Sequence, residues 1–300
     1  MIKVAIVIVN WNQPDLTVEC LKSIYDLRCK NYELQIVVVD NGSTDDSVKK
    51  IQSSKVTVIE TGENLGFAGG NNVGITHAME NGADYICLLN NDTVVDPSLI
   101  EGLLKTYKEY PKAGAVSPKI YFAKGFEFHK NRYEKSELGK VIWYAGGDMD
   151  WNNVYGSNHG VDEVDKGQFD SIRQTDFATG CCMMIPAKVF QEVGLLNEDY
   201  YLYLEDVELC QRIRNTKYKI LYTPYTHLWH KVSQSSAIGS QLNDYFITRN
   251  RLSFGMNYAP FRARFALLRE SIRLLLNGRK WQKVGVRDFY RRNFGKGSWK

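Results

Sequence analysis

Short apolar runs alternate with amphipathic segments along residues 1–90. The runs cover residues 4–9, 34–39, 56–60 and 85–89. The first two are rich in Val and Ile without regular polar alternation, which is typical of strands buried on both faces of a parallel sheet. The intervening segments have helical spacing, and helices are expected at 15–27, 44–53 and 71–81. This order predicts an α/β fold with a doubly wound, mostly parallel central sheet.

Polar side chains follow the ends of these predicted strands. Asp40 follows the second strand, Asn64 lies in the turn after the third, and Asp92 comes after the fourth. Ligands of open α/β sheets bind beyond the carboxyl ends of the strands. The sequence therefore predicts a ligand site at this edge of the sheet.

The second half of the chain has a weaker pattern. Residues 116–170 are harder to interpret, and within them the charged and aromatic segment 124–140 shows no clear period, so we expect loop and irregular strand there. Beyond them we expect a strand at 176–186, helices at 187–193 and 205–214, and a strand at 219–222. Because no low-complexity linker or repeat divides the chain, we expect both halves to share one sheet.

Composition places the chain among ordinary globular proteins. Of its 300 residues, 44% are hydrophobic and 24% are charged, which excludes collagen, coiled coil and wholesale disorder. No apolar run approaches the roughly 18–20 residues that span a bilayer, and the N-terminus lacks the shape of a signal peptide, so we expect a cytoplasmic protein. The six Cys residues form no C-x-x-C pair and are expected to be buried free thiols.

Charge is distributed unevenly along the chain. Residues 261–300 hold twelve Lys and Arg but only two acids, Glu270 and Asp288, for a net charge of +10. Residues 1–260 hold 26 basic and 32 acidic residues, for a net charge of −6. A body without a basic stripe argues against a nucleic-acid partner, whereas the basic tail favours an anionic surface.

The tail also carries an apolar stripe at helical spacing. The stripe consists of Phe261, Phe265, Leu268, Ile272 and Leu275, and it is flanked by Arg262, Arg264, Arg269, Arg273 and Arg279. A basic amphipathic helix of this kind can lie on an anionic membrane, here the inner face of the cell membrane. The alternatives are packing on the protein's own body or on a second copy in a homodimer.

Five motifs appear in order within residues 1–255. They are 9–12 (VNWN), 38–45 (VVDNGSTD), 64–72 (NLGFAGGNN), 88–92 (LLNND) and 203–209 (YLEDVEL). Together they resemble the inverting glycosyltransferases of family 2, which have the GT-A fold, and the glycine-rich motif resembles their rhamnosyltransferase-like branch. The resemblance implies a nucleotide-sugar-binding half at 1–115 and an acceptor-binding, catalytic-base half at 116–255. Residues 256–300 form the C-terminal helical tail.

Asp40 is the first candidate for substrate binding. A carboxylate at a strand end can accept the N3–H of uracil or thymine, and the resemblance implies this role. The Asp-Asn-Gly sequence is also typical of an Asx turn or helix cap, which is the structural alternative. Asn10 and Asn12, at the end of the first strand, either line the nucleoside pocket or form a polar turn.

The glycine-rich motif is expected to be a loop before a helix. Gly66 and Gly70 would let the backbone approach a ligand closely, and the N-terminus of the following helix attracts phosphate. Asn64, Asn71 and Asn91 complete the polar set expected around the nucleotide. A purely structural loop is the alternative.

Residues 90–92 occupy the position of the family's D-x-D motif. A divalent cation there would neutralise the diphosphate leaving group, and hard cations such as Mg²⁺ or Mn²⁺ prefer oxygen ligands. Asp92 is the expected ligand unless it caps a helix. Asn90 replaces the first Asp of the motif and is a weaker ligand. The family pattern adds His230, although a lone His is more often structural.

Glu205 and Asp206 begin a predicted helix after an aromatic run. Inverting transfer needs one carboxylate to deprotonate the acceptor hydroxyl, and the resemblance implies that Asp206 is this base. Glu205 would orient the acceptor. Acids at a helix start are also ordinary, because they complement the helix dipole. Arg249 matches a recurring family segment and either contacts phosphate or forms a structural salt bridge.

The sequence therefore predicts transfer of a sugar from a nucleoside diphosphate to a hydroxyl of a growing cell-surface saccharide, free or lipid-linked. The first donor predicted is dTDP-rhamnose and the next a UDP-sugar. A sugar-phosphate nucleotidyltransferase is disfavoured because residues 10–14 lack Gly and basic residues. A catalytically inactive nucleotide-sugar- or saccharide-binding scaffold stays open because Asn90 replaces an acid.

Overall fold

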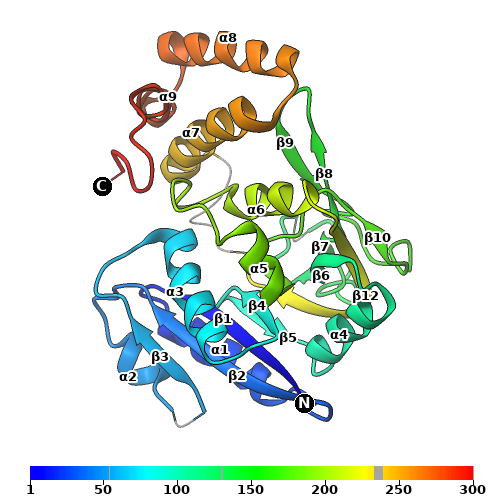
Figure 1. Cartoon of the computed structure of the whole chain (residues 1–300). Coiled ribbons are helices and arrows are strands. Elements are labelled where there is room, and N and C mark those ends of the chain that lie inside the picture. Colours follow the sequence, from blue (N-terminus) through cyan, green and yellow to red (C-terminus); the bar gives the residue numbers. More distant parts are fainter. Residues whose placement is uncertain (54, 130, 233–238, 300) are drawn as a thin grey trace.

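The computed structural model describes residues 1–53, 55–129, 131–232 and 239–299 (Figure 1). Its strands are β1 (Ile2–Asn10), β2 (Tyr32–Asp40), β3 (Thr57–Glu60), β4 (Tyr85–Leu89), β5 (Thr93–Val95), β6 (Ala113–Phe122), β7 (Ile142–Tyr144), β8 (Gly147–Asp150), β9 (Tyr155–Asn158), β10 (Arg173–Gln174), β11 (Cys182–Pro186) and β12 (Lys219–His230). Its helices are α1 (Pro14–Tyr25), α2 (Ser47–Ile51), α3 (Gly66–Glu80), α4 (Leu99–Glu109), α5 (Ala187–Val193), α6 (Glu205–Arg214), α7 (Gln241–Tyr258), α8 (Phe261–Asn277) and α9 (Lys280–Arg291).

The first half forms the expected parallel sheet. β1 lies between β2 and β4 and runs parallel to both, and β2 is parallel to β3. Residues 4–8 of β1 are almost completely buried, as an apolar run without polar alternation predicts. Asn10 and Asp40 are register partners at the carboxyl ends of β1 and β2, so the two side chains begin from adjacent points at that edge.

The second half continues the same sheet, as expected. The strand order is β10-β12-β6-β11-β4-β1-β2-β3, with β5 and β7 attached to β12 and β6. β11 is antiparallel to β4, whereas β6 and β12 are parallel. The expected boundary near residue 115 therefore falls inside β6. The sheet is mixed and mostly parallel in its first half, which fits the predicted fold class.

Three elements differ in extent from the sequence expectation. β12 runs to His230 instead of ending at 222, because it passes Pro224 through a register shift between Thr223 and His227. The strand expected at 176–186 is only β11, and α2 is shorter than 44–53. Residues 124–140 carry no strand or helix in the part that the structure describes, so the expected loop is present but the expected irregular strand is not.

The glycine-rich motif is the first turn of α3 and not a loop. α3 begins at Gly66, five residues before the expected start. A Cβ atom at Gly74 would lie 2.3 Å from the Val7 side chain, and one at Gly70 would lie 3.0 Å from Val9. These two glycines therefore let α3 pack closely on β1.

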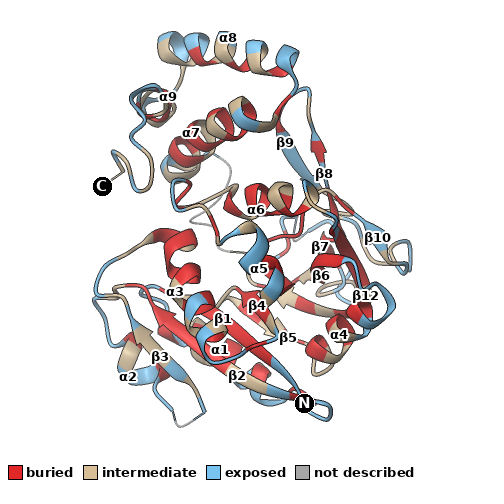
Figure 2. Ribbon diagram, viewed as in Figure 1, coloured by how far each residue is buried: buried red, intermediate tan, exposed pale blue. Residues whose placement is uncertain are grey.

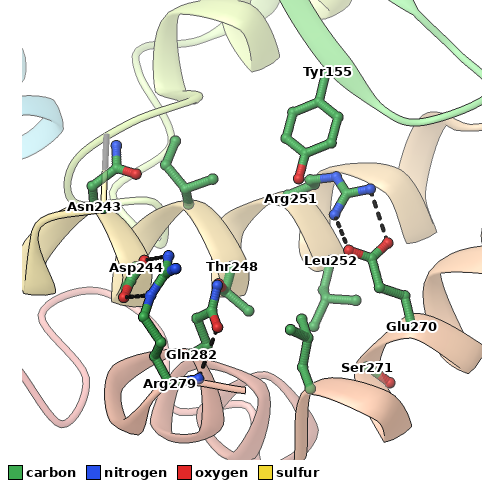
Figure 3. A pocket seen from close by; sticks show the side chains of 13 residues that line it. Tyr155, Asn243, Asp244, Thr248, Arg251, Leu252, Glu270, Ser271, Arg279 and Gln282 are labelled. Carbon is green, nitrogen blue, oxygen red and sulfur yellow. Dashed lines mark hydrogen bonds and ion pairs between the residues drawn. The ribbon is translucent and has the colours of Figure 1, made fainter. Parts of the chain in front are cut away.

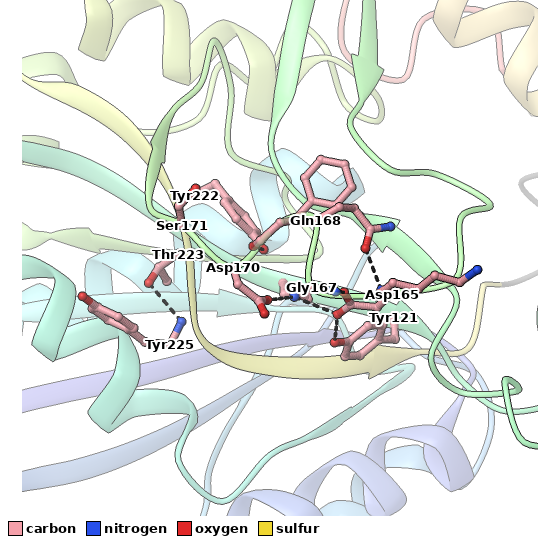
Figure 4. Close-up of polar contacts among 12 residues, drawn as sticks. Tyr121, Asp165, Gly167, Gln168, Asp170, Ser171, Tyr222, Thr223 and Tyr225 are labelled. Atoms are coloured by element: carbon pink, nitrogen blue, oxygen red, sulfur yellow. Dashed lines mark hydrogen bonds and ion pairs between the residues drawn. The ribbon is translucent and has the colours of Figure 1, made fainter.

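An ion cluster centred on the buried Lys119 fixes the loop before β10 to the sheet (Figure 4). The ammonium of Lys119, in β6, lies 2.7 Å from carboxylate oxygens of Asp165 and Asp170, and Tyr121 also donates to Asp165. Burial alone would raise the pKa of Asp165, but the bonds from Lys119 and Tyr121 lower it below its usual range. The irregular region thus has a defined anchor on β6.

Helices α7, α8 and α9 pack together at one end of the molecule (Figure 1). Figure 2 shows that buried residues follow the sheet and the inner sides of the helices. Within the described residues, no helix combines the length and apolar character needed to cross a bilayer. Five of the six cysteines are buried free thiols as expected, but Cys29 is exposed.

Candidate active site

Asp40 is held at the sheet edge by two hydrogen bonds. The Asn10 side-chain amide donates to Oδ2 at 2.8 Å, and the Ser43 backbone N–H donates to Oδ1 at 3.0 Å. Asp40 is only 2% exposed, and Asn10 is fully buried. A carboxylate oxygen can accept more than one hydrogen bond, so the fixed Asp40 carboxylate keeps acceptor capacity for a ligand N–H.

Thr17 connects this group to the end of β4. Its hydroxyl donates to Asn10 Oδ1 at 2.7 Å and accepts from the Asn91 side-chain amide at 3.0 Å. Asn91 precedes Asp92 directly, so the chain of hydrogen bonds from Asp40 ends beside the expected cation ligand. Asn12 is exposed and joins the turn after β2, because its Oδ1 accepts from the Thr44 backbone N–H at 2.8 Å.

The start of α3 has partners within the chain. The backbone N–H groups of Phe67 and Ala68 donate to the Tyr201 carbonyl at 2.7 and 3.2 Å. Gly66 has a φ of +75°, and a Cβ atom there would lie 2.5 Å from the Tyr201 ring. The donors expected to bind phosphate at this helix end are therefore already paired, and Gly66 serves a close contact with Tyr201.

Asn64 and Asn71 of this motif also form hydrogen bonds within the chain, as a structural role for the motif would require. Asn64 Oδ1 accepts from the Gly66 N–H at 2.9 Å, and the Asn71 amide donates to the Phe67 carbonyl at 2.8 Å. Together with the close packing of Gly70 on β1, these contacts shape the start of α3.

Asp92 and His230 form a buried pair at the ends of β4 and β12. Asp92 Oδ1 lies 3.1 Å from His230 Nε2, and the side chains are 12% and 8% exposed. Trp143 packs edge-on against the imidazole at 4.7 Å. Burial lowers the pKa of His230, but Cys181 and Asp92 outweigh it and raise this pKa to about 10.

The pair has the properties of part of a divalent-cation site. Apart from their mutual ion pair and the contact of His230 with Cys181, the buried atoms Asp92 Oδ1 and His230 Nδ1 have no hydrogen-bond partner among the described residues. No group of three or more His, Cys, Asp or Glu gathers around a metal position within that part of the chain. Cations bound with nucleotides take one or two carboxylates and complete their shell with phosphate and water oxygens. Asp92, with His230 beside it, fits that arrangement.

Asn90 joins this pair to β11. Its backbone N–H donates to the Cys181 carbonyl at 2.9 Å, which fixes the start of the 90–92 turn. The Cys181 side chain contacts His230, and burial raises the pKa of its thiol. Cys181 is therefore a direct neighbour of the expected cation site.

Glu205 and Asp206 have different surroundings at the start of α6. Asp206 accepts 2.8 Å hydrogen bonds from the backbone N–H groups of Gly180 and Val207, and it stays partly accessible. Glu205 is 4% exposed, and its Oε2 has no partner among the described residues. Burial raises the pKa of both carboxyls, with Asp206 adding to the shift of Glu205, whereas the two N–H donors oppose the shift of Asp206. Asp206 is thus the better candidate for the ionised group.

Gly180 and Cys181 lie between the candidate base Asp206 and the expected cation site. Gly180 contacts Asp206, and a Cβ atom at Gly180 would lie 3.4 Å from Asp206 Oδ2. The next residue, Cys181, contacts His230. Asp40, Asp92 and Asp206 are therefore linked through a continuous set of side-chain and backbone contacts.

The backbone before α6 has an unusual conformation. Tyr201, Tyr203 and Leu204 have φ angles of 61°, 70° and 70°, a left-handed region that costs these residue types of order 1 kcal/mol or more each. The Asn250 amide donates at 2.8 Å to the carbonyls of Tyr200, Leu202 and Tyr203. These bonds hold the backbone that leads into Glu205 and Asp206.

Arg249 takes part in the same anchor. It is fully buried and donates at 3.1 Å to the carbonyls of Asp199 and Tyr200 and at 2.7 Å to that of Gly295. Its guanidinium is therefore used within the chain, so we assign it this structural role and not the phosphate contact or salt bridge considered from the sequence.

Sequence reasoning missed several residues of the site. Thr17, Ser43, Gly180 and Asn250 position the candidate side chains through hydrogen bonds. Ser43 and Asn250 had a local signal, because Ser43 lies in the 38–45 motif and Asn250 lies beside Arg249 in a segment that resembles the family.

A separate cavity lies between α7, α8 and α9 (Figure 3). Its volume is about 350 Å³, and its lining includes Leu252, Leu274 and the ion pair of Arg251 with Glu270. None of the site residues predicted from the sequence lines it. The cavity belongs to the C-terminal helices and not to the candidate active site.

Comparison with curated proteins finds sugar-transfer enzymes. The low-salt glycan biosynthesis hexosyltransferase Agl10 of Haloferax volcanii is 27% identical over 217 residues, which cover 72% of this chain but only 63% of that protein. The N-acetylglucosaminyl-diphospho-decaprenol L-rhamnosyltransferase of Mycobacterium tuberculosis is 24% identical, with 68% of each chain covered. The dTDP-rhamnosyl transferase RfbF of Shigella flexneri is 25% identical, with 77% of this chain and 74% of that protein covered.

Solved structures share the fold. The mannosyltransferase PcManGT of Pyrobaculum calidifontis, in complex with GDP-Man and Mn²⁺, matches 96% of this chain and 74% of its own, with a TM-score of 0.57 and 16% identity. GalNAc-T7 with UDP, GalNAc and Mn²⁺ matches 97% of this chain and 57% of its own, with a TM-score of 0.62 and 15% identity. These similarities confirm the GT-A fold. The sequence profile described as "Glycosyl transferase family 2" matches residues 5–194, and the chain therefore belongs to glycosyltransferase family 2.

Proposed function

We propose that this protein is an inverting glycosyltransferase that moves a sugar from a nucleoside diphosphate to an acceptor hydroxyl. The observation that carries the proposal is the environment of Asp206. This carboxylate is partly accessible, is oriented by two backbone donors and is connected to the Asp92–His230 pair through Gly180 and Cys181. A base next to a leaving-group site is what a single displacement requires.

In this mechanism Asp206 accepts the proton of the acceptor hydroxyl as its oxygen attacks the anomeric carbon. The bond from that carbon to the diphosphate breaks, and the nucleoside diphosphate leaves. A general base of this kind contributes about 10²–10⁴-fold to the rate. Glu205, whose pKa is raised by burial, stays protonated and is available as a hydrogen-bond donor to the acceptor.

The cation site would act on the leaving group. Asp92, with His230 beside it, would hold Mg²⁺ or Mn²⁺. A bound cation of this kind neutralises charge that develops on the diphosphate. The chain itself supplies few ligands, so we expect the cation to bind much more tightly with the nucleotide than alone.

The base of the donor would be read by Asp40. Its carboxylate accepts hydrogen bonds, which favours the N3–H of uracil or thymine over adenine or cytosine. The names of the mycobacterial and Shigella relatives indicate rhamnose transfer, and the Shigella name specifies dTDP. We therefore propose dTDP-rhamnose as the first donor to test and UDP-sugars as the second.

The acceptor would be a growing cell-surface saccharide. The mycobacterial relative is named for an acceptor on a decaprenyl diphosphate, and the Haloferax relative for glycan biosynthesis. A lipid-linked saccharide is therefore our preferred acceptor class.

A donor screen tests this proposal. Purified protein is given dTDP-rhamnose or UDP-sugars with Mn²⁺ and a lipid-linked saccharide, and nucleoside diphosphate release is measured. We expect acceptor-dependent release that EDTA abolishes and Mn²⁺ restores, and that Asp92→Ala reduces at least about tenfold, because Asp92 carries the cation. Nucleotide binding without release from any donor would instead support the inactive scaffold.

A further inference from the structure

Helix α8 has a buried face and an exposed apolar face. Ala263, Leu267 and Ser271 are buried against the body. The contact is close, because a Cβ atom at Gly255 of α7 would lie 2.2 Å from the Leu267 side chain. This narrow face of small and apolar residues is the one that packs (Figure 2).

The stripe found in the sequence lies mainly on the opposite side. Phe261, Phe265, Ile272 and Leu276 are 82%, 64%, 58% and 69% exposed. Their positions fall within about 60° of arc at 100° per residue, so they form one ridge along the helix. Within the described residues, this ridge does not pack on the protein's own body. That alternative, which the sequence left open, therefore does not apply to the ridge.

A row of arginines lies beside the ridge. Arg262, Arg269 and Arg273 are exposed and are spaced at i, i+7 and i+11, which places them within about 40° of arc. None of the three makes an ion pair or hydrogen bond with the part of the chain that the structure describes. By contrast, Arg264 donates to the Ala259 carbonyl at 2.7 Å.

The two acidic residues of the tail already have partners within the chain. Glu270 forms an ion pair at 2.8 Å with Arg251, on the side of α8 that faces α7. Asp288 is 2% exposed and accepts from Ser298 and Tyr245. The outer face of α8 therefore combines exposed apolar side chains with positive charge that has no acidic counterpart on the same helix face.

We propose that this outer face docks on the surface of an anionic phospholipid bilayer. The ridge would enter the boundary between headgroups and acyl chains, and the arginine row would bind lipid phosphates. A second copy would bring the same unpaired arginines to the interface without an acid to meet them, whereas lipid phosphates supply the missing charge. The proposal rests on α8 alone and does not depend on the proposed reaction.

Vesicle sedimentation with the full chain tests the proposal. Binding is compared between phosphatidylcholine vesicles and vesicles of equimolar phosphatidylcholine and phosphatidylglycerol. We expect binding to the anionic vesicles to be at least about tenfold tighter. The double variants Phe265→Ser/Ile272→Ser and Arg269→Glu/Arg273→Glu should each weaken it at least about tenfold.

Matched variants control for general loss of apolar surface or charge. Phe128, which is 56% exposed, is replaced in Phe128→Ser, and two exposed lysines are replaced in Lys49→Glu/Lys188→Glu. These variants should bind like the unmodified protein, and all should keep its thermal midpoint. Light scattering reports the oligomeric state.

Three results would overturn the proposal. The first is no preference for anionic vesicles. The second is equal weakening by the α8 variants and their controls. The third is a dimer in solution that Phe265→Ser/Ile272→Ser converts to monomer, because the ridge would then be an interface between copies.

Discussion

At the scale of single residues, Glu205 and Asp206 show how two adjacent carboxyls can have different chemistry. Asp206 receives two backbone N–H groups, whereas Glu205 Oε2 has no partner among the described residues. Both pKa values are raised by burial, but more hydrogen bonds oppose the shift of Asp206, and the charge of Asp206 adds to the shift of Glu205. We therefore assign proton acceptance to Asp206 and a neutral form to Glu205.

This assignment predicts how stability changes with pH. Burial raises the pKa of Glu205 in the folded state. The stability that protonated Glu205 contributes is therefore complete below its unfolded-state pKa, and it is lost as pH rises through its folded-state pKa. The side chain of the Glu205→Gln variant stays neutral at every pH. Between acidic and neutral pH, the free energy of unfolding of this variant should therefore fall less than that of the unmodified protein, by about 1.4 kcal/mol for each unit by which the Glu205 pKa is shifted. Urea unfolding at several pH values, in EDTA, measures this difference.

The exposed Glu63 provides the control, because Glu63→Gln should keep the pH dependence of the unmodified protein. If Glu205→Gln also kept that dependence, Glu205 would be ionised in the folded state and our assignment would be wrong.

At the scale of elements, the segment from Tyr200 to Leu204 joins α3, α6 and α7. Its left-handed residues cost free energy, and the three hydrogen bonds from Asn250 offset that cost. The Tyr201 carbonyl also caps α3. Asn250 is thus a positioning residue, because it acts on Asp206 through the backbone that precedes it.

Asn250→Leu tests this role. Loss of the hydrogen bonds that the Asn250 amide shares among the three carbonyls should lower the free energy of unfolding by about 2–4 kcal/mol. We also expect kcat to fall at least about tenfold, while affinity for the nucleoside diphosphate stays within about twofold, because the Asp40 group is held by other contacts. Single-turnover kinetics and calorimetric titration separate the two effects.

Asn257, exposed on the same helix, provides the control variant Asn257→Leu, which should change neither quantity. Equal loss of kcat and nucleotide affinity in Asn250→Leu would show general damage instead of positioning.

The elements also show which parts of the fold and site could be predicted from the sequence. Residues 4–9 and 34–39 predicted buried parallel strands because such runs fit few other environments, and the pairing of Asn10 with Asp40 followed from that arrangement. The glycine motif was assigned to a loop because its glycines could equally serve ligand approach or packing, and the close approach of Gly70 to Val9 is visible only in the folded structure. The partners of Arg249 lie almost fifty residues away in the chain and leave no local signal.

At the scale of the whole molecule, one sheet edge collects groups from distant segments. Asp40 follows β2, Asp92 follows β4, and Asp206 begins α6, yet contacts through Asn10, Thr17, Gly180 and Cys181 link them. The C-terminal helices support this edge through Arg249 and Asn250 and present α8 outward. The spacing of α8 residues identified its apolar stripe, but only the folded structure shows that the stripe faces away from the body.

The most direct test of the central claim is the rate of nucleoside diphosphate release by Asp206→Asn, measured with a donor and acceptor that the unmodified protein uses. We predict a fall in kcat of about 10²–10⁴-fold, with affinity for the nucleoside diphosphate within about twofold of the unmodified protein. Turnover by Asp206→Asn at the unmodified rate would contradict the account, because the proton of the acceptor would then be taken by another group.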